Sequence, residues 1–145
     1  MVIDESNLFL DLTDIMHVDT EFGLLSVAFH PIFVHNGRFF ASYICDGDQW
    51  FHVTLSEFTV NNSAINPALA TRGNPSEVRR IFMTGIAYKN AIASQLLFGP
   101  DRYLYNLTRV GKTELDPYNH AQNKKSMLWK LLKFDVDNFP SEHYN

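Results

Sequence analysis

The chain has 145 residues, of which 46% are hydrophobic, 14% aromatic and 19% charged. This composition excludes a disordered chain, which would be rich in charge and poor in aromatic residues. Twelve basic and sixteen acidic residues give a net charge of -4, and no stretch is strongly basic, so nucleic acid is not an expected partner.

Short β-like runs separated by turn residues recur along the chain. The apolar run 24–29 ends at His30-Pro31, and Asn36-Gly37 is a strong turn signal before the next, aromatic run. The last run also fits one face of a helix, but Phe134 and Val136 alternate with aspartates, which favours a strand. The predicted strands span residues 24–29, 38–45, 51–60, 78–83, 95–98, 103–107 and 128–136. Such a pattern predicts one all-β domain, residues 1–145, built as a sandwich, barrel or propeller.

Two hairpin-like units resemble each other within the chain. LLSVAFHP is followed by a turn and RFF, and SQLLFGP is followed by a tighter turn and RYLY. This echo favours a propeller, in which each blade repeats the same strands. The polar loop 61–76 fits an insertion within the first unit, and the chance similarity of two β-hairpins is the alternative.

The chain offers few signals of compartment or covalent chemistry. No apolar run approaches the ~20 residues that a membrane-spanning helix requires, so we expect no membrane insertion. The N-terminal residues MVIDESNLFLDL lack the features of a signal peptide. Cys45 is the only cysteine and has no basic neighbour to activate it, so we expect a structural thiol at a strand end.

Four segments together resemble one family. They are GLLSVAFHPIFVHNGRFFASY, EVRRIFMTG, QLLFGPDRYLY and DPYNHAQNKKSMLWKLLKFDVDN, spread from Gly23 to Asn138. In this order they resemble the glucose/sorbosone dehydrogenase family, most closely its plant members, the hedgehog-interacting-protein-like (HIPL) proteins. The resemblance implies a six-bladed β-propeller of antiparallel strands, of which this chain would span two to three blades. The founding enzymes of the family oxidise sugars with pyrroloquinoline quinone (PQQ) and calcium.

The same resemblance predicts that catalysis is lost. Ala91 stands where the family has its proton-accepting histidine, and Arg109-Val110 replaces the Gly-Asp pair whose aspartate polarises that histidine. Loss of a general base alone forfeits about 10²–10⁴ in rate. We therefore expect no catalytic residue and no retained PQQ or calcium. Glu21 is the one candidate cofactor-binding residue, and a solvated acid in a turn is its alternative.

Other candidate groups favour structural roles. The six histidines show no metal-binding spacing, and His30 at a strand end is expected to be structural. Oxygen donors near the C-terminal end do not fit a calcium loop and are expected to cap turns; they are Asp116, Asn119, Asn123, Asp135 and Asp137.

Three further residues carry local expectations. Trp129 replaces a glycine of the family, which implies either a strained turn with positive φ or a side chain swung outward. Asn61 and Asn106 begin glycosylation sequons. Asn106 lies in a predicted strand, where a glycan is not expected.

Three hypotheses follow for function. The first is a truncated, catalytically inactive member of the PQQ-dependent family. The second is a binding module of the hedgehog-interacting type, and the third is the product of a decayed or wrongly delimited gene with no evolved function. Unpaired strand edges predict self-association. The resemblance implies export or membrane anchoring, for which the sequence shows no targeting signal.

Overall fold

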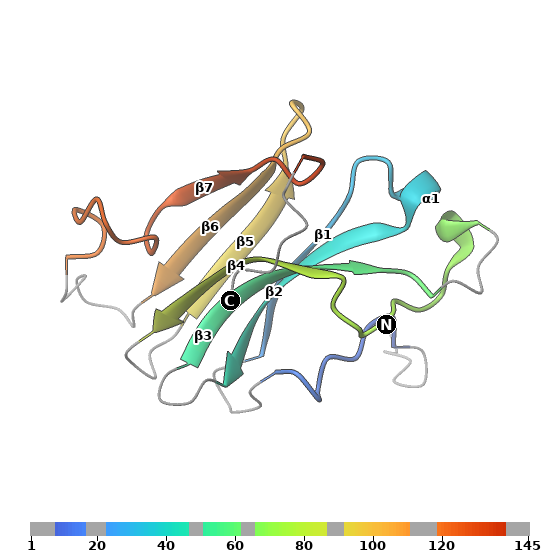
Figure 1. The fold of residues 1–145 in the computed structure, drawn as a ribbon, viewed down its shortest axis with the longest axis horizontal. Coiled ribbons are helices and arrows are strands. Elements are labelled where there is room, and N and C mark those ends of the chain that lie inside the picture. The colour runs from blue at the N-terminus through green and yellow to red at the C-terminus, as the bar shows by residue number, and fades with distance from the viewer. Residues whose placement is uncertain are drawn as a thin grey trace, which may run out of the picture.

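The computed structural model describes residues 8–16, 23–46, 51–61, 66–86, 92–110 and 119–138. Its regular secondary structure consists almost wholly of strands (Figure 1). The strands are β1 (Leu24–Phe29), β2 (Arg38–Asp46), β3 (Phe51–Thr59), β4 (Arg79–Ile86), β5 (Ile92–Phe98), β6 (Leu104–Val110) and β7 (Leu131–Phe134). Two short helical turns accompany them, α1 (Phe33–Asn36) and a 3-10 turn (Pro67–Leu69).

The strands form two antiparallel sheets. The first has the order β1-β2-β3-β4 and the second the order β5-β6-β7, so each sheet is a meander of consecutive strands. Within the described residues neither sheet closes into a barrel. The predicted all-β, antiparallel fold class is confirmed, and the arrangement is consistent with part of a β-propeller.

The strand predictions agree best where turn residues bound an apolar run. β1 has the predicted bounds, because His30-Pro31 ends the apolar run. β7 is shorter than the predicted run 128–136, since Trp129 has a positive φ of 61° and cannot continue a strand. The short helix α1 was not predicted; Gly37, at φ 63°, ends it and donates its N–H to the carbonyl of Phe33.

The internal echo has a structural counterpart. The first unit forms the β1–β2 hairpin and the second forms the β5–β6 hairpin, so each unit opens one of the two sheets. The loop expected as an insertion joins β3 to β4 and contains the 3-10 turn and a bridge between Val60 and Gly73.

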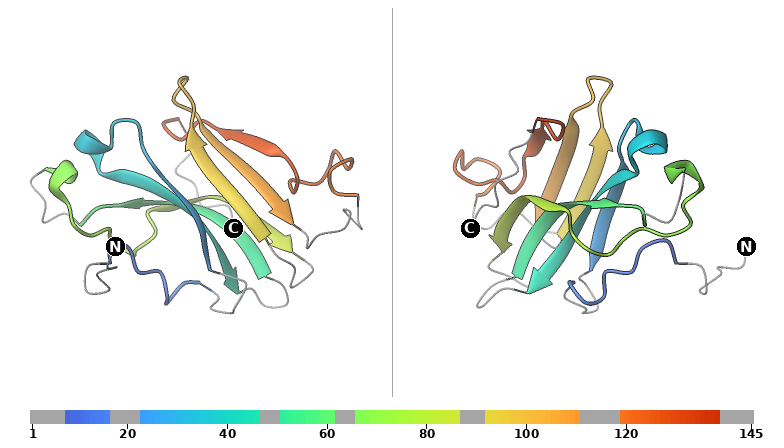
Figure 2. Two further views of the ribbon diagram at one scale, coloured as in Figure 1. Left: turned by 180° about the vertical axis from the view of Figure 1, so that it is seen from behind. Right: turned by 45° about the vertical axis from the view of Figure 1, so that its right-hand side comes forward.

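Apolar side chains fill the space between the two sheets. β1 lies beside β5, and the sheets spread apart from this line as two layers (Figure 2). The shared cluster draws residues from both sheets: Ala28, Phe40, Leu55, Ile81, Leu96, Leu104 and Val136. Burying such a side chain stabilises a fold by about 1.5–3 kcal/mol, so this cluster is the main force that joins the sheets.

The two outward-facing surfaces differ. Phe9, Leu10 and Met16 of the N-terminal segment pack against Phe39 and Phe58 on the far side of the first sheet.

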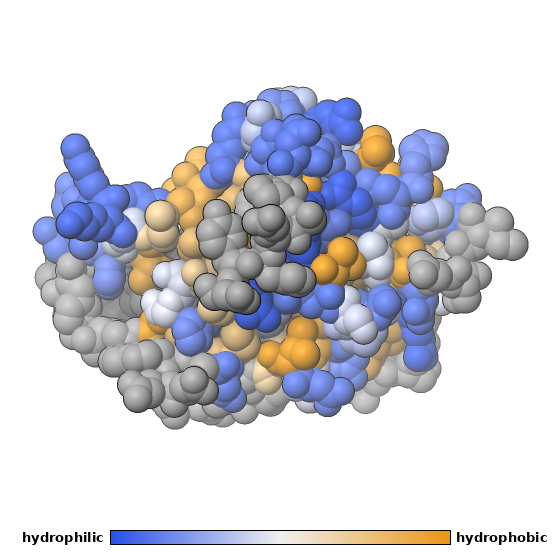
Figure 3. Space-filling view, viewed as in Figure 1, coloured by the Kyte–Doolittle hydropathy of each residue, from blue (hydrophilic) through white to orange (hydrophobic). Residues whose placement is uncertain are grey.

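The far side of the second sheet, which we call the β5–β7 outer face, exposes Leu97, Leu107 and Leu131. Apolar surface is visible over β6 and β7 (Figure 3). In the described residues no helix has the length and apolar character needed to cross a membrane.

Candidate functional site

A group of connected charged and titratable side chains lies where the two sheets meet. We call it the junction cluster and define it as His30, Arg38, Glu57, Arg79 and Asp137. Arg38 begins β2, Arg79 begins β4, and Glu57 of β3 lies opposite Arg79 in the strand register. The antiparallel pairing therefore places two cations beside one carboxylate at the same end of the first sheet.

Glu57 bridges the two arginines. Its Oε1 accepts a hydrogen bond from Arg38 Nε at 2.6 Å, and its Oε2 accepts one from Arg79 Nε at 2.6 Å. Both guanidinium groups also donate to the carbonyl oxygen of Val136, Arg38 at 2.9 Å. Since Val136 follows β7, these bonds tie the last described segment to the first sheet. Charge-assisted bonds of this kind are stronger than neutral ones.

Asp137 supplies the second carboxylate of the cluster. It accepts from Arg38 Nη1 at 2.7 Å and lies 3.1 Å from His30 Nε2, with Arg102 at 3.6 Å. Partial burial acts to raise the pKa of Asp137, but the hydrogen bond and charge of Arg38 and the contact with His30 outweigh it and lower the pKa. The carboxylate is therefore charged at neutral pH.

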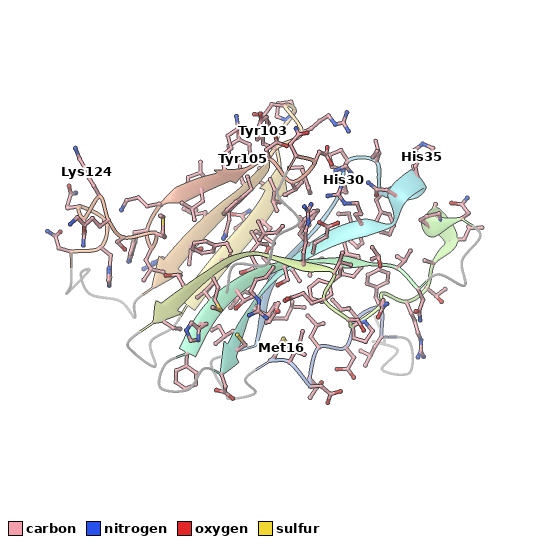
Figure 4. The ribbon with its side chains drawn as sticks, in the orientation of Figure 1. Met16, His30, His35, Tyr103, Tyr105 and Lys124 are labelled. Carbon is pink, nitrogen blue, oxygen red and sulfur yellow. The ribbon has the colours of Figure 1, made fainter. Side chains whose placement is uncertain are left out.

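His30 is held in one tautomer. Its side chain is fully buried at the end of β1 (Figure 4). Nδ1 accepts from Asn36 Nδ2 at 2.9 Å and from the N–H of Ile32 at 3.3 Å, so the proton resides on Nε2 and is donated to Asp137. Burial, followed by the charge of Arg38, lowers the pKa of His30 despite the opposing effect of Asp137.

These contacts define what the junction cluster does. Both nitrogens of His30 are engaged within the protein, so this imidazole is not placed to take a proton from a bound substrate. The two carboxylates and the arginines neutralise one another across the boundary between the sheets. The geometry is that of a structural ion network that fixes the two sheets together.

The predicted catalytic and cofactor positions are only partly described. Glu21 and Ala91 lie outside the described residues. Val110 ends β6 opposite Ile92, the first residue of β5, and the Arg109 guanidinium lies 5.4 Å from the centre of the Trp129 ring.

Calcium binding, which the sugar dehydrogenase resemblance implies, depends on acidic side chains that converge. The described residues contain no group of three or more His, Cys, Asp or Glu that could hold a metal ion. The expectation that the chain retains neither PQQ nor calcium stays a prediction.

The turn-capping predictions have different outcomes at different residues. Asp135 does cap a turn, accepting from the N–H and side-chain amide of Asn138, and Asn123 accepts from the N–H of Lys125. For Asp137 the prediction is wrong, because its carboxylate belongs to the junction cluster. Asp116 lies outside the described residues.

Three local predictions can be compared with the structure. Cys45 is a free thiol near the end of β2, 3.2 Å from Thr54 Oγ1, as expected of a structural residue. Asn106 is fully buried in β6, which confirms that it is no place for a glycan. Of the two alternatives for Trp129, the structure shows the turn with positive φ, and the side chain packs partly buried in the cluster that contains Leu128.

Sequence reasoning did not find Arg38, Glu57 and Arg79 as a group. The available signal was a charged residue at the same end of three neighbouring predicted strands. Only the pairing register shows that these residues meet, and the contribution of Val136 and Asp137 depends on packing between the sheets.

Two antiparallel meanders joined by a partly buried ion network place the chain among all-β proteins of the partial-propeller type. The chain is a homologue of the plant HIPL proteins. It is 41% identical to the HIPL1 protein of Arabidopsis thaliana over 96% of this chain, and 41% identical to the HIPL2 protein over 97%. It is 31% identical to the Hedgehog-interacting protein of Mus musculus over 81% of this chain.

The matched region is a small part of each relative. The chain spans 24% of HIPL1, 25% of HIPL2 and 17% of the mouse Hedgehog-interacting protein. No protein-family model matches the chain. The resemblance to sugar dehydrogenases therefore stays a prediction, whereas the relationship to HIPL proteins is established.

Proposed function

We propose that the chain is part of a protein-binding module of the HIPL type. The observation that carries the proposal is the similarity to the Hedgehog-interacting protein, whose name states an interaction with another protein, over 81% of this chain. The junction cluster supports it, because its charged groups are engaged in holding the sheets together. A rigid β scaffold of this kind suits recognition through its surface.

A binding experiment tests the proposal. The full chain, immobilised, is exposed to extracellular or cell-wall proteins and, separately, to cytosolic proteins. Any retained protein is purified and titrated against the chain in solution. We expect saturable binding that the unlabelled chain and the matching segment of HIPL1 both compete away. Absence of any saturable, competed partner contradicts the proposal, because non-specific adhesion does not saturate.

We propose further that the isolated chain self-associates with a second copy of itself. β4 and β7 are the outer strands of the two sheets, so each has one edge without a strand partner among the described residues. The β5–β7 outer face adjoins the β7 edge and exposes three leucines, of which Leu131 is 61% exposed. An open edge beside apolar surface favours pairing between identical chains.

Light scattering after size-exclusion chromatography tests self-association. We expect the apparent mass to rise with concentration, and Leu131→Lys to reduce this rise because it places a charge at the edge. Leu69→Lys is the matched control, since Leu69 is exposed on the 3-10 turn, which belongs to neither sheet. A monomer at all concentrations contradicts the proposal.

A second proposal concerns the sugar dehydrogenase resemblance: the chain corresponds to a catalytically inactive region of that family. The substitutions themselves support it: Ala91 and Val110 stand where the resemblance places a histidine and an aspartate, and neither side chain can accept a proton. The test is a dye-reduction assay with PQQ, calcium and a panel of sugars; turnover above a heat-inactivated control contradicts it.

A further inference from the structure

A polar layer interrupts the apolar interior between the two sheets. Because side chains alternate along a strand, Ser42 of β2 shares its face with Phe40 and Ile44, which belong to the apolar clusters above and below it. Asn106 of β6 likewise shares its face with the buried Leu104. We call the polar layer the seam and define it by five residues: Ser26, Ser42, Ser94, Asn106 and Thr108.

One hydrogen bond between β1 and β5 fixes how the seam residues of the first sheet are aligned with those of the second. The backbone N–H of Leu96 on β5 donates to Ser26 Oγ on β1 at 2.9 Å. Ser26 lies opposite Ser42 in the β1–β2 register, and Leu96 lies opposite Asn106 in the β5–β6 register. Ser42 and Asn106 are therefore each one strand outward from the same inter-sheet bond, on the facing sides of the two sheets.

Each of these two residues has a buried polar atom without a partner among the described residues. Both residues are fully buried, and the unpaired atoms are Ser42 Oγ and Asn106 Nδ2. The other end of the Asn106 amide is satisfied: Oδ1 accepts from Ser94 Oγ at 2.9 Å and from Thr108 Oγ1 at 3.3 Å. Turning the amide over would exchange the two ends but would still leave one of them unpaired.

A direct bond between the two atoms is not favoured by the dimensions of the interface. Facing sheets lie about 10 Å apart, and serine and asparagine are short side chains. β1 and β5, which touch directly, are the inner strands, so the separation increases toward β2 and β6. A single bridging molecule with two to four hydrogen bonds is the usual solution for buried polar atoms in such a position.

We propose that the seam binds an ordered water molecule that joins Ser42 Oγ to Asn106 Nδ2. The water accepts one hydrogen bond from the Asn106 amide and a second one from the Ser42 hydroxyl. The hydroxyl oxygens of Ser94 and Thr108, which donate to Asn106, keep lone pairs that accept the remaining protons of the water. A polar layer completed in this way fixes one alignment of the two sheets, since a slip would leave its polar atoms unpaired between apolar side chains.

Direct observation is the first test. In a high-resolution crystal structure of the full chain, or by nuclear Overhauser transfer from long-lived water to the Asn106 side-chain amide in solution, we expect one water within hydrogen-bonding distance of both atoms. A direct contact between Ser42 and Asn106, or a dry contact of each with apolar atoms, overturns the proposal.

The sign of a stability change is the second test. If Ser42 Oγ binds the water, Ser42→Ala removes one of its partners, and the unfolding equilibrium constant rises by roughly two- to tenfold. If Ser42 Oγ is simply unpaired, the same change removes a buried polar atom and the constant falls. A fall therefore overturns the proposal.

A double-mutant cycle keeps the test decisive if one variant is strongly destabilised. The effects of Ser42→Ala and Asn106→Leu are expected to be non-additive, because both residues hold the same water. Thr54→Ala is the matched control: Thr54 is equally buried, but it lies on the opposite side of the first sheet, beside Cys45. The proposal is overturned if Ser42→Ala and Asn106→Leu are as additive as Thr54→Ala and Asn106→Leu.

Discussion

His30 Nε2 lies 3.1 Å from Asp137 Oδ1, and this hydrogen bond joins two residues that are 107 positions apart in the chain. His30 directly follows the first strand, and Asp137 follows the last described strand. Arg38 contacts the same carboxylate oxygen, so this one atom connects the end of β1 and the start of β2 with the segment that follows β7. The stability of the contact between the sheets should therefore respond to changes at Asp137.

The first prediction is that Asp137→Asn lowers the free energy of unfolding by about 1–3 kcal/mol. The change removes the charged acceptor of Arg38 and His30, both of which stay largely buried. Urea denaturation at constant pH measures it. Asp135→Asn is the matched control, since the Asp135 carboxylate only caps a turn to Asn138. Equal effects of the two variants would show that Asp137 contributes no more than a turn cap.

The second prediction concerns pH. Burial, and then the charge of Arg38, lowers the pKa of His30 below its ordinary value of 6.5, so the native chain binds fewer protons here than the unfolded chain. The free energy of unfolding therefore decreases as the pH falls below about 6.5, and this contribution is fully present above that pH. Denaturation between pH 5 and 7.5 measures the slope.

Two matched variants show whether this pH dependence of the free energy of unfolding arises from His30. His30→Gln should flatten the dependence between pH 5 and 7, whereas His35→Gln, which removes an exposed imidazole, should leave it in place. A slope that persists unchanged in His30→Gln would place its origin in another group.

Much of the sheet structure could be predicted from the sequence because the signals were local. The bounds of β1 follow from an apolar run that ends at His30-Pro31, and β2 begins directly after Asn36-Gly37. α1 could not be predicted, since a four-residue helix shows no period and depends on Gly37 to end it.

The junction cluster could not be predicted for a different reason. Glu57 binds Arg38 and Arg79 only because of the strand register, and their bonds to Val136 depend on how the sheets pack. The local sequence around Asp137 resembles that around Asp135, yet one carboxylate caps a turn and the other crosses between the sheets. Local sequence contains no information that separates them.

The third prediction concerns the backbone at Trp129, where φ is 61°. A side chain in this conformation costs about 1–2 kcal/mol, whereas glycine adopts it freely. Trp129→Gly and Trp129→Ala lose the same indole packing, so their difference isolates the backbone. We expect the glycine variant to be the more stable by about 1 kcal/mol in urea denaturation.

Lys130 provides the control for this comparison. It is the next residue along the chain and does not have a positive φ. There the alanine variant should be the more stable of the two, since glycine costs more conformational entropy where φ is negative. If alanine is also favoured at position 129, the strained conformation is not significant for stability.

The fourth prediction is that a glycan on Asn106 is incompatible with the folded chain. Asn106 begins a sequon, but it is fully buried between the sheets and its Oδ1 accepts from Ser94 and Thr108. Asn61 also begins a sequon and is exposed at the end of β3.

When the chain is expressed through a secretory pathway, the soluble, cooperatively melting fraction should contain no glycan on Asn106. A glycan on Asn61 should be tolerated there, and any chains modified at Asn106 should collect in the aggregated fraction. Mass spectrometry of peptides from the two fractions measures the distribution; a glycan on Asn106 in chains with the native melting temperature would mean that the two sheets can separate at the seam without loss of the fold.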